Sequence, residues 1–243
     1  MPTAPPQILR VLTALVLLAA PAALRAELIP PDVVFPRLPR EGKSQADFVP
    51  AGWMVEKQAQ ADLNGDNRLD FMMVLHMADP KNVVANPDGF GVDELDTNPR
   101  MLVVGFQDQR HRFHLQAANH TLIPRQTNPV LDDPLADAEV KNGALKISLG
   151  FWASAGSWYS SQVEYTLRFQ SDCFRLIGYD YEETKRNTWE TSAISVNYLT
   201  GKVKTSKGTI EDDVMQDKWR PLRGKRKVCL DDIGDGMEFH PEP

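Results

Sequence analysis

The 243-residue chain contains only two cysteines and has no apolar run long enough to span a bilayer. It also lacks the short motifs that mark common active sites, because HExxH, GxSxG, CxxC and a glycine-rich phosphate loop are all missing. No segment repeats. These absences argue against a membrane-spanning helix and against the enzyme classes that those motifs identify. A catalytic set dispersed along the chain stays open, since such sets are recognised by geometry and not by sequence order.

The first 26 residues have the pattern of a cleaved secretory signal. Arg10 provides a positive flank, and about ten apolar residues follow it in 11–20. Cleavage is expected after Ala22 or after Ala26, so we expect the mature protein to be periplasmic or secreted, with no membrane span. An uncleaved membrane anchor is the alternative, which the short apolar run disfavours.

The remaining 217 residues, from Glu27 onward, are acidic. Without Arg10 and Arg25 they include 25 basic and 33 acidic residues, a net charge of −8 with histidine neutral. This charge disfavours a nucleic acid or an anionic membrane as the partner. The length and the ordinary apolar fraction fit one large all-β domain or two small ones.

Both cysteines, Cys173 and Cys229, lie in the part that is expected to be exported. An oxidising compartment favours a disulfide between them, which would stabilise the fold by roughly 4 kcal/mol if unstrained. We expect this bond to tie the C-terminal segment to a core strand. Free thiols or a metal pair are the alternatives, and no other Cys or His stands at ligand spacing from either residue.

Alternating apolar and polar residues predict a mainly β fold. The clearest example is 163–169, where every second side chain is apolar. Turn residues at Asn142-Gly143 and Ser171-Asp172 separate neighbouring strands. We predict an antiparallel sheet of sequential hairpins, either a sandwich or an open barrel. A minor C-terminal helix is predicted over 209–220, where apolar residues recur at roughly helical spacing and Pro221 ends the segment.

The domain organisation follows from composition. Residues 27–50 hold five prolines and few periodic apolar positions, which predicts an extended Pro-rich arm. A single β-rich domain is expected over 51–229, with an acidic loop at 62–70 and a long loop at 77–99. Residues 230–243 are predicted to be a polar tail.

The acidic loop has the spacing of a calcium-binding turn. Oxygen-bearing side chains stand at its positions 1, 3, 5 and 9, and calcium takes six to eight oxygen ligands. The predicted ligands are Asp62, Asn64, Asp66 and Asp70 through their side chains and Arg68 through its backbone carbonyl. The predicted ion is structural, since it neutralises converging carboxylates. A polar turn without an ion is the alternative, because turns favour Asp, Asn and Gly in any case.

The pattern DxNxDxxxD resembles the calcium loops of the FG-GAP and VCBS repeats of integrin-like propellers. The resemblance implies that the acidic positions are ligands. Asn67 replaces the usual glycine, which is tolerable because Asn adopts left-handed backbone angles more readily than most residues. Met73 stands at loop position 12 in place of the Glu of an EF-hand, which argues against that fold. A propeller needs several blades, so this single copy implies a metal site and no propeller.

The wider chain resembles uncharacterised exported bacterial proteins that carry one such loop. The resemblance rests on the segments Phe48-Val49-Pro50, Gly52-Trp53, Leu176 to Asp180 and Asn197 to Gly201. It implies no activity.

Residues 150–161 combine small residues with the aromatics Trp152, Trp158 and Tyr159. This composition is typical of a binding loop, because rigid aromatic rings offer contact area at low entropic cost. Alternatively, Trp152 and Tyr159 belong to the flanking strands and cover the edge of the core. Asp180 and Glu182 share one face of a predicted strand and are interpreted as solvated residues.

Export, acidity, the missing motifs and the aromatic loop together favour a non-enzymatic, calcium-stabilised protein. We expect it to bind a protein or glycan of the cell envelope, and an inhibitor of a cell-wall hydrolase is one concrete form. A secreted hydrolase with a dispersed acidic and calcium site is the alternative. A structural module of an envelope assembly is the third hypothesis.

Overall fold

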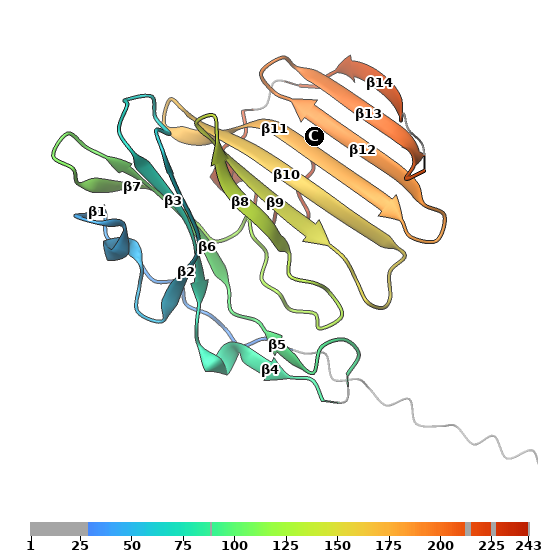
Figure 1. The fold of residues 1–243 in the computed structure, drawn as a ribbon, viewed down its shortest axis with the longest axis horizontal. Helices are drawn as coiled ribbons and strands as arrows, with labels where there is room; N and C mark the ends of the chain where they lie inside the picture. The colour runs from blue at the N-terminus through green and yellow to red at the C-terminus, as the bar shows by residue number, and fades with distance from the viewer. Residues whose placement is uncertain (1–28, 88, 212–214, 225–226, 243) are drawn as a thin grey trace, which may run out of the picture.

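The computed structural model describes residues 29–87, 89–211, 215–224 and 227–242. Nearly all of its regular structure is antiparallel β, arranged in two large sheets and one small hairpin (Figure 1). The predicted fold class, mainly β with sequential antiparallel strands, is confirmed, and the described strands do not close into a barrel. The predicted signal peptide lies outside the described residues. Within these ranges no helix is long and apolar enough to cross a membrane.

The five-stranded sheet has the strand order β1-β7-β6-β3-β2. Its strands are β1 (Glu41–Gly42), β2 (Trp53–Ala61), β3 (Asp70–Met77), β6 (Arg100–Gln107) and β7 (Phe113–Asn119). The 3-10 turn η1 (Gln45–Phe48) precedes β2. The long loop predicted at 77–99 contains the turn η2 (Pro80–Asn82) and a hairpin of β4 (Val83–Ala85) and β5 (Glu94–Asp96).

The seven-stranded sheet is a meander, in which each strand pairs with the next in sequence. It contains β8 (Leu135–Lys141), β9 (Ala144–Phe151), β10 (Tyr159–Gln170), β11 (Cys173–Lys185), β12 (Glu190–Asn197), β13 (Lys202–Thr209) and β14 (Gln216–Pro221). Asn142 and Gly143 have φ angles of 52° and 68°, and they form the predicted turn between β8 and β9. Ser171, with φ of 65°, begins the turn between β10 and β11. Both turn predictions are confirmed.

Two apolar clusters hold these layers together. The larger one lies between the sheets, where Met72 and Val104 of the five-stranded sheet belong to the same cluster as Ile147 and Tyr165. The smaller one lies on the other face of β3 and β6, where Phe71 and Met73 meet Phe48 from the N-terminal segment. Strand β3 is therefore apolar on both faces because both faces are covered.

The helix predicted over 209–220 is wrong. Strand β13 continues to Thr209, and Gln216–Pro221 forms β14, which pairs antiparallel with β13. Residues 212–214 lie outside the described ranges. Ile210 is 57% exposed and Trp219 is 65% exposed. Ile210 and Trp219 therefore do not face a core, so their helical spacing did not mark a buried stripe.

The segment 230–243 was predicted to be a polar tail, and the structure corrects this interpretation too. Leu230 and Ile233 are buried in the larger apolar cluster, and Phe239 packs against it. The hydroxyl of Tyr165 donates a hydrogen bond to the Gly236 carbonyl. The segment begins with the 3-10 turn η3 (Leu230–Asp232), and its few apolar side chains cover the inner face of the seven-stranded sheet.

The predicted disulfide between Cys173 and Cys229 is present, with Cα atoms 5.9 Å apart. Cys173 is the first residue of β11, and Cys229 precedes η3. The bond therefore ties the C-terminal segment to a strand of the core, as the sequence predicted.

Candidate functional site

The acidic loop connects β2 to β3 at one end of the five-stranded sheet. Asp62 organises its first half, because its carboxylate accepts hydrogen bonds from four backbone N–H groups, the shortest from Gly65 at 2.7 Å and Asn67 at 2.8 Å. Gly65 and Asn67 have φ angles of 86° and 64°, so the chain turns through the left-handed region at both residues. Burial opposes ionisation of Asp62, and the backbone donors outweigh it and lower its pKa.

Asp70 closes the loop from inside the protein. It is fully buried, and its two oxygens accept hydrogen bonds from the N–H groups of Leu63 and Gln107, both at 2.9 Å. Burial raises the pKa of Asp70, and the nearby carboxylates of Asp66 and Asp62 raise it further. Asp66 and Asp62 therefore lie close enough to oppose the ionisation of Asp70.

Arg68 partly balances this charge. Its guanidinium forms an ion pair with Asp66 and donates to the Gln107 carbonyl at 2.7 Å. The structure thus holds the side chains of Asp62, Asp66 and Asp70 by separate hydrogen bonds to the backbone, and the Asn64 side chain accepts from the N–H of Asp66 at 3.0 Å.

The chemistry of this donor set fits a hard cation, since carboxylate oxygens have further lone pairs beyond those used by N–H donors. Within the described residues, no three His, Cys, Asp or Glu side chains are grouped as a metal site. Calcium at this loop stays a prediction.

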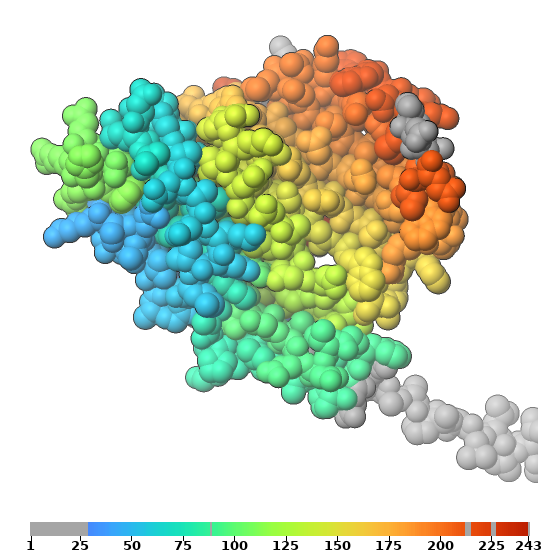
Figure 2. All heavy atoms as spheres, viewed as in Figure 1, coloured from blue at the N-terminus to red at the C-terminus, as the bar shows by residue number. Residues whose placement is uncertain are grey.

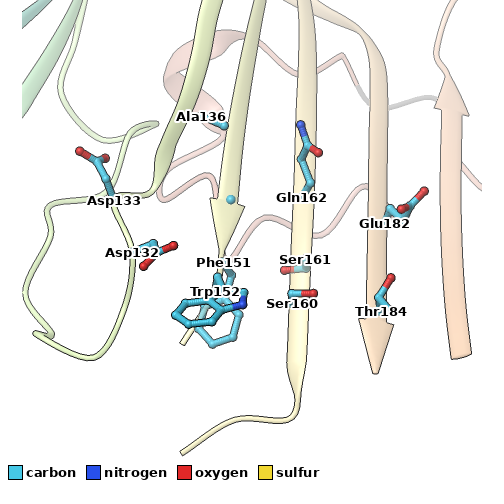
Figure 3. Close-up of a pocket in the computed structure, with 11 residues that line it drawn as sticks. Asp132, Asp133, Ala136, Phe151, Trp152, Ser160, Ser161, Gln162, Glu182 and Thr184 are labelled. Atoms are coloured by element: carbon cyan, nitrogen blue, oxygen red, sulfur yellow. The ribbon is translucent and has the colours of Figure 1, made fainter. Parts of the chain in front are cut away.

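A separate groove of about 370 Å³ lies on the seven-stranded sheet, near the end of β9 and the start of β10 (Figure 3). Its wall contains Trp152, which directly follows β9, and Asp132 and Asp133 from the loop before β8. Its floor contains neighbouring side chains of β10 and β11, among them Gln162 and Glu182. The groove therefore combines one large ring with short polar groups.

The floor is the outward face of the seven-stranded sheet. Side chains alternate along β10, so that Val163 and Tyr165 enter the core and Gln162 points outward. The ladder places Gln162 opposite Glu182 and Ser160 opposite Thr184. Figures 1 and 2 show no described element over this face of the sheet. Gln162 and Glu182 are therefore exposed to solvent, on strands that are paired on both sides.

Arg186, just beyond the end of β11, holds the aromatic loop in place. Its guanidinium carbon lies 5.0 Å from the centre of the Trp152 ring, a cation-π contact. The same guanidinium donates to the Ala153 carbonyl at 2.9 Å and also to the Ser157 carbonyl. The backbone N–H of Arg186 donates to the Trp158 carbonyl at 2.7 Å. The loop is thus fixed at several points, with Trp152 left 40% exposed.

Arg100 connects the groove to the rest of the fold. This side chain is only 5% exposed and forms paired hydrogen bonds with Glu56 of β2, at 2.6 and 2.8 Å, and with Asp133, at 2.9 and 2.6 Å. The hydrogen bonds from Arg100 lower the pKa of Glu56. Asp133 is therefore neutralised at the margin of the groove.

Asp132 and Glu182 differ from Asp133. Within the part of the chain that the structure describes, their carboxylates form no hydrogen bond or ion pair with the protein, and the lining of the groove contains no Lys or Arg. The lining of the groove consequently carries two carboxylates without a protein partner in the described chain, and the guanidinium of Arg186 lies against the Trp152 ring.

The sequence identified only part of this site. Trp152 lines the groove as a binding loop predicts, whereas Trp158 and Tyr159, 67% and 44% exposed, are not among the lining residues. Asp132 and Gln162 were missed, and Glu182 was interpreted as merely solvated. The alternating polar residues of β10 and β11 were a usable signal, but their register with each other was needed to join them into one surface.

Comparison of the chain with protein-family models, with curated proteins and with solved structures finds no match.

Proposed function

We propose that this is an exported, non-enzymatic binding protein that holds a protein or glycan of the cell envelope in the groove beside Trp152. The observation that carries the proposal is the juxtaposition of an exposed indole, fixed by Arg186, with the carboxylates of Asp132 and Glu182, which lack protein partners in the described chain. Binding sites typically place a few polar groups beside an aromatic surface on a rigid scaffold.

The rigidity of the groove favours binding over a solvated surface without function. Arg186 uses two side-chain hydrogen bonds and one backbone hydrogen bond to hold the loop, and Arg100 fixes the opposite margin through Asp133. A side chain that is already ordered loses little entropy when a ligand arrives. An exposed tryptophan that is ordered in this way is suited to serve as a contact surface for a ligand.

Export and calcium form the second part of the proposal. The Cys173–Cys229 disulfide fits an oxidising compartment, and the loop at 62–70 carries three carboxylates within nine residues. In this proposal, a calcium ion at the loop stabilises the end of the five-stranded sheet and takes no part in ligand binding, since the loop and the groove share no residue.

The test is a pull-down with the oxidised protein and solubilised cell-envelope material, quantified for the wild type and for Trp152→Ala. Loss of the ring is expected to weaken retention by about thirtyfold or more, the size of an interface hot spot. Trp219→Ala is the matched control, because Trp219 is also exposed but lies on the far edge strand β14. Equal retention by the wild type and Trp152→Ala would contradict the proposal.

One observation favours a second candidate, a glycoside hydrolase. Asp132 and Glu182 line the same groove, and two carboxylates flanking a sugar are the usual catalytic pair of such enzymes. This candidate predicts that glycans release reducing ends during incubation, and that Glu182→Gln abolishes release while binding persists. A binding protein releases none.

A further inference from the structure

We infer that the groove is built for a glycan that carries free amino groups. The inference rests on the proposed function and adds the chemical class of the ligand, which follows from charge, from the strands that form the floor and from the shape of the lining side chains.

Charge is the first argument. Asp132 and Glu182 offer carboxylates without protein partners in the described chain, Asp133 is already paired with Arg100, and no lining residue is basic. An acidic sugar or a phosphate would be repelled by these carboxylates and would find no cation among the lining residues. An ammonium group, in contrast, gains a charge-assisted hydrogen bond from either free carboxylate.

The floor of the groove argues against a peptide. Peptides commonly bind a sheet by adding a strand to a free edge. Strands β9, β10 and β11 are interior strands, each paired on both sides, so their backbone groups are already used. A ligand at this place must be recognised by side chains alone.

The side chains suit a sugar ring. Trp152 presents a flat surface whose electron-rich face attracts the slightly positive C–H groups on one side of a pyranose. Beside it, Gln162 and Glu182 are cross-strand neighbours, and Ser160 and Thr184 form the next pair, about 7 Å further along the strands. Amides, carboxylates and hydroxyls in two such rows can donate to and accept from the hydroxyl and amino groups of successive sugar units.

No deep apolar recess accompanies these groups, because the lining contains only Trp152 and Phe151 as large apolar residues. Apolar side chains usually anchor a bound protein segment in such a recess. The observations therefore favour a saccharide chain lying across the face of the sheet.

The experiment is a calorimetric titration of the wild-type protein at mildly acidic pH with four probes of equal length. They are a β-1,4-linked glucosamine tetramer, its N-acetylated form, a galacturonate tetramer and tetralysine. We expect the glucosamine tetramer to bind about tenfold more tightly than the N-acetylated form, with affinity that falls as salt is added. The galacturonate tetramer is expected not to bind.

Two variants assign the effect to the groove. Glu182→Gln and Asp132→Asn should each reduce the advantage of the glucosamine tetramer over its N-acetylated form by about three- to tenfold. Asp172→Asn removes the same charge at the opposite end of the β10–β11 hairpin and should leave the advantage intact.

Several results would overturn the inference. Tetralysine binding as tightly as the glucosamine tetramer would indicate a cationic peptide ligand, and equal affinity for the amino and N-acetylated forms would remove the role of charge. Binding of none of the probes, while Trp152 is still required for retention of envelope material, would refute the amino-glycan and leave the binding function standing. Retention that is independent of Trp152 would instead refute the proposed function itself.

Discussion

The acidic loop and the groove both gather carboxylates, but they use them in different ways. In the loop, the oxygens of Asp62 and Asp70 accept hydrogen bonds from backbone N–H groups, and Asp66 pairs with Arg68. In the groove, the carboxylates of Asp132 and Glu182 have no protein partner within the described residues. The contrast teaches that acidic composition alone does not locate a binding site.

The partners of a carboxylate decide its role. A carboxylate whose hydrogen bonds are met inside the chain stabilises the fold, and its removal leaves donors unsatisfied. A carboxylate without protein partners contributes little to stability, and it is available to a ligand. Asp133 belongs to the first kind although it lines the groove, because Arg100 holds it.

The largest expected effect on stability comes from removing the two carboxylates that pair with Arg100. Glu56→Ala combined with Asp133→Ala leaves the buried guanidinium of Arg100 without either acidic partner. We expect the free energy of unfolding to fall by about 3–5 kcal/mol, the cost of an uncompensated buried charge. Urea denaturation measures this change.

The matched control also removes two acidic side chains, through Asp132→Ala combined with Glu182→Ala. Because these side chains lack protein partners, stability should change by no more than about 0.5 kcal/mol. Equal losses in the two double variants would contradict the distinction between paired and free carboxylates.

The next effect tests the buried end of the acidic loop. Asp70→Asn keeps the size of the side chain but turns one acceptor oxygen into an NH2 group that faces a backbone donor. One backbone N–H and the new NH2 group then both lack an acceptor, and we expect a loss of about 3 kcal/mol in the free energy of unfolding. A change below about 1 kcal/mol in urea denaturation would show that Asp70 does not fasten the loop to Gln107 as the geometry requires.

The third test adds calcium and determines whether the acidic side chains of the loop also coordinate an ion. With calcium a hundredfold above its dissociation constant, a single site stabilises the folded state by about 2.7 kcal/mol. We expect the melting temperature of the EDTA-treated protein to rise with calcium and not with magnesium, and Asp66→Ala to abolish the rise. Identical melting curves with and without calcium would reduce the loop to a polar turn.

Local signals in the sequence were sufficient for much of the fold. The strict alternation in 163–169 and the Asn142-Gly143 turn predicted strands and a hairpin that the structure contains, because both signals depend on neighbouring residues alone. The helix prediction over 209–220 was wrong because Gln216–Pro221 pairs with β13 as an edge strand, and the exposed Ile210 and Trp219 do not face a core. The prediction of a polar tail at 230–243 was wrong because a few apolar residues in a mostly polar segment were enough to cover the sheet.

The groove could not be predicted from local patterns, because it depends on contacts between residues that are far apart in the sequence. Arg100 and Asp133 are 33 positions apart, and Arg186 and Ala153 are also separated by 33. No pattern within either segment indicates its partner. The sequence could therefore suggest Trp152 as a binding residue, but it could not place Asp132, Gln162 and Glu182 around the ring.

The smallest expected effect, the pH dependence of the acidic loop, distinguishes two carboxylates within it. Backbone donors, acting against burial, lower the pKa of Asp62, so its ionised form contributes stability above the unfolded pKa of about 3.9, and this contribution is lost as the pH falls below that value. Burial raises the pKa of Asp70, so its ionisation costs stability, and acidification through its folded pKa relieves that cost.

The two variants Asp62→Asn and Asp70→Asn should consequently respond to acid in opposite directions. In urea denaturation between neutral pH and about pH 3, the stability gap between the wild type and Asp62→Asn is expected to shrink, because protonated Asp62 no longer differs from Asn in charge. The gap between the wild type and Asp70→Asn is expected to widen, since only the wild type regains stability when Asp70 takes up its proton. If both gaps change in the same direction, the two carboxylates do not occupy the contrasting environments that the loop geometry gives them.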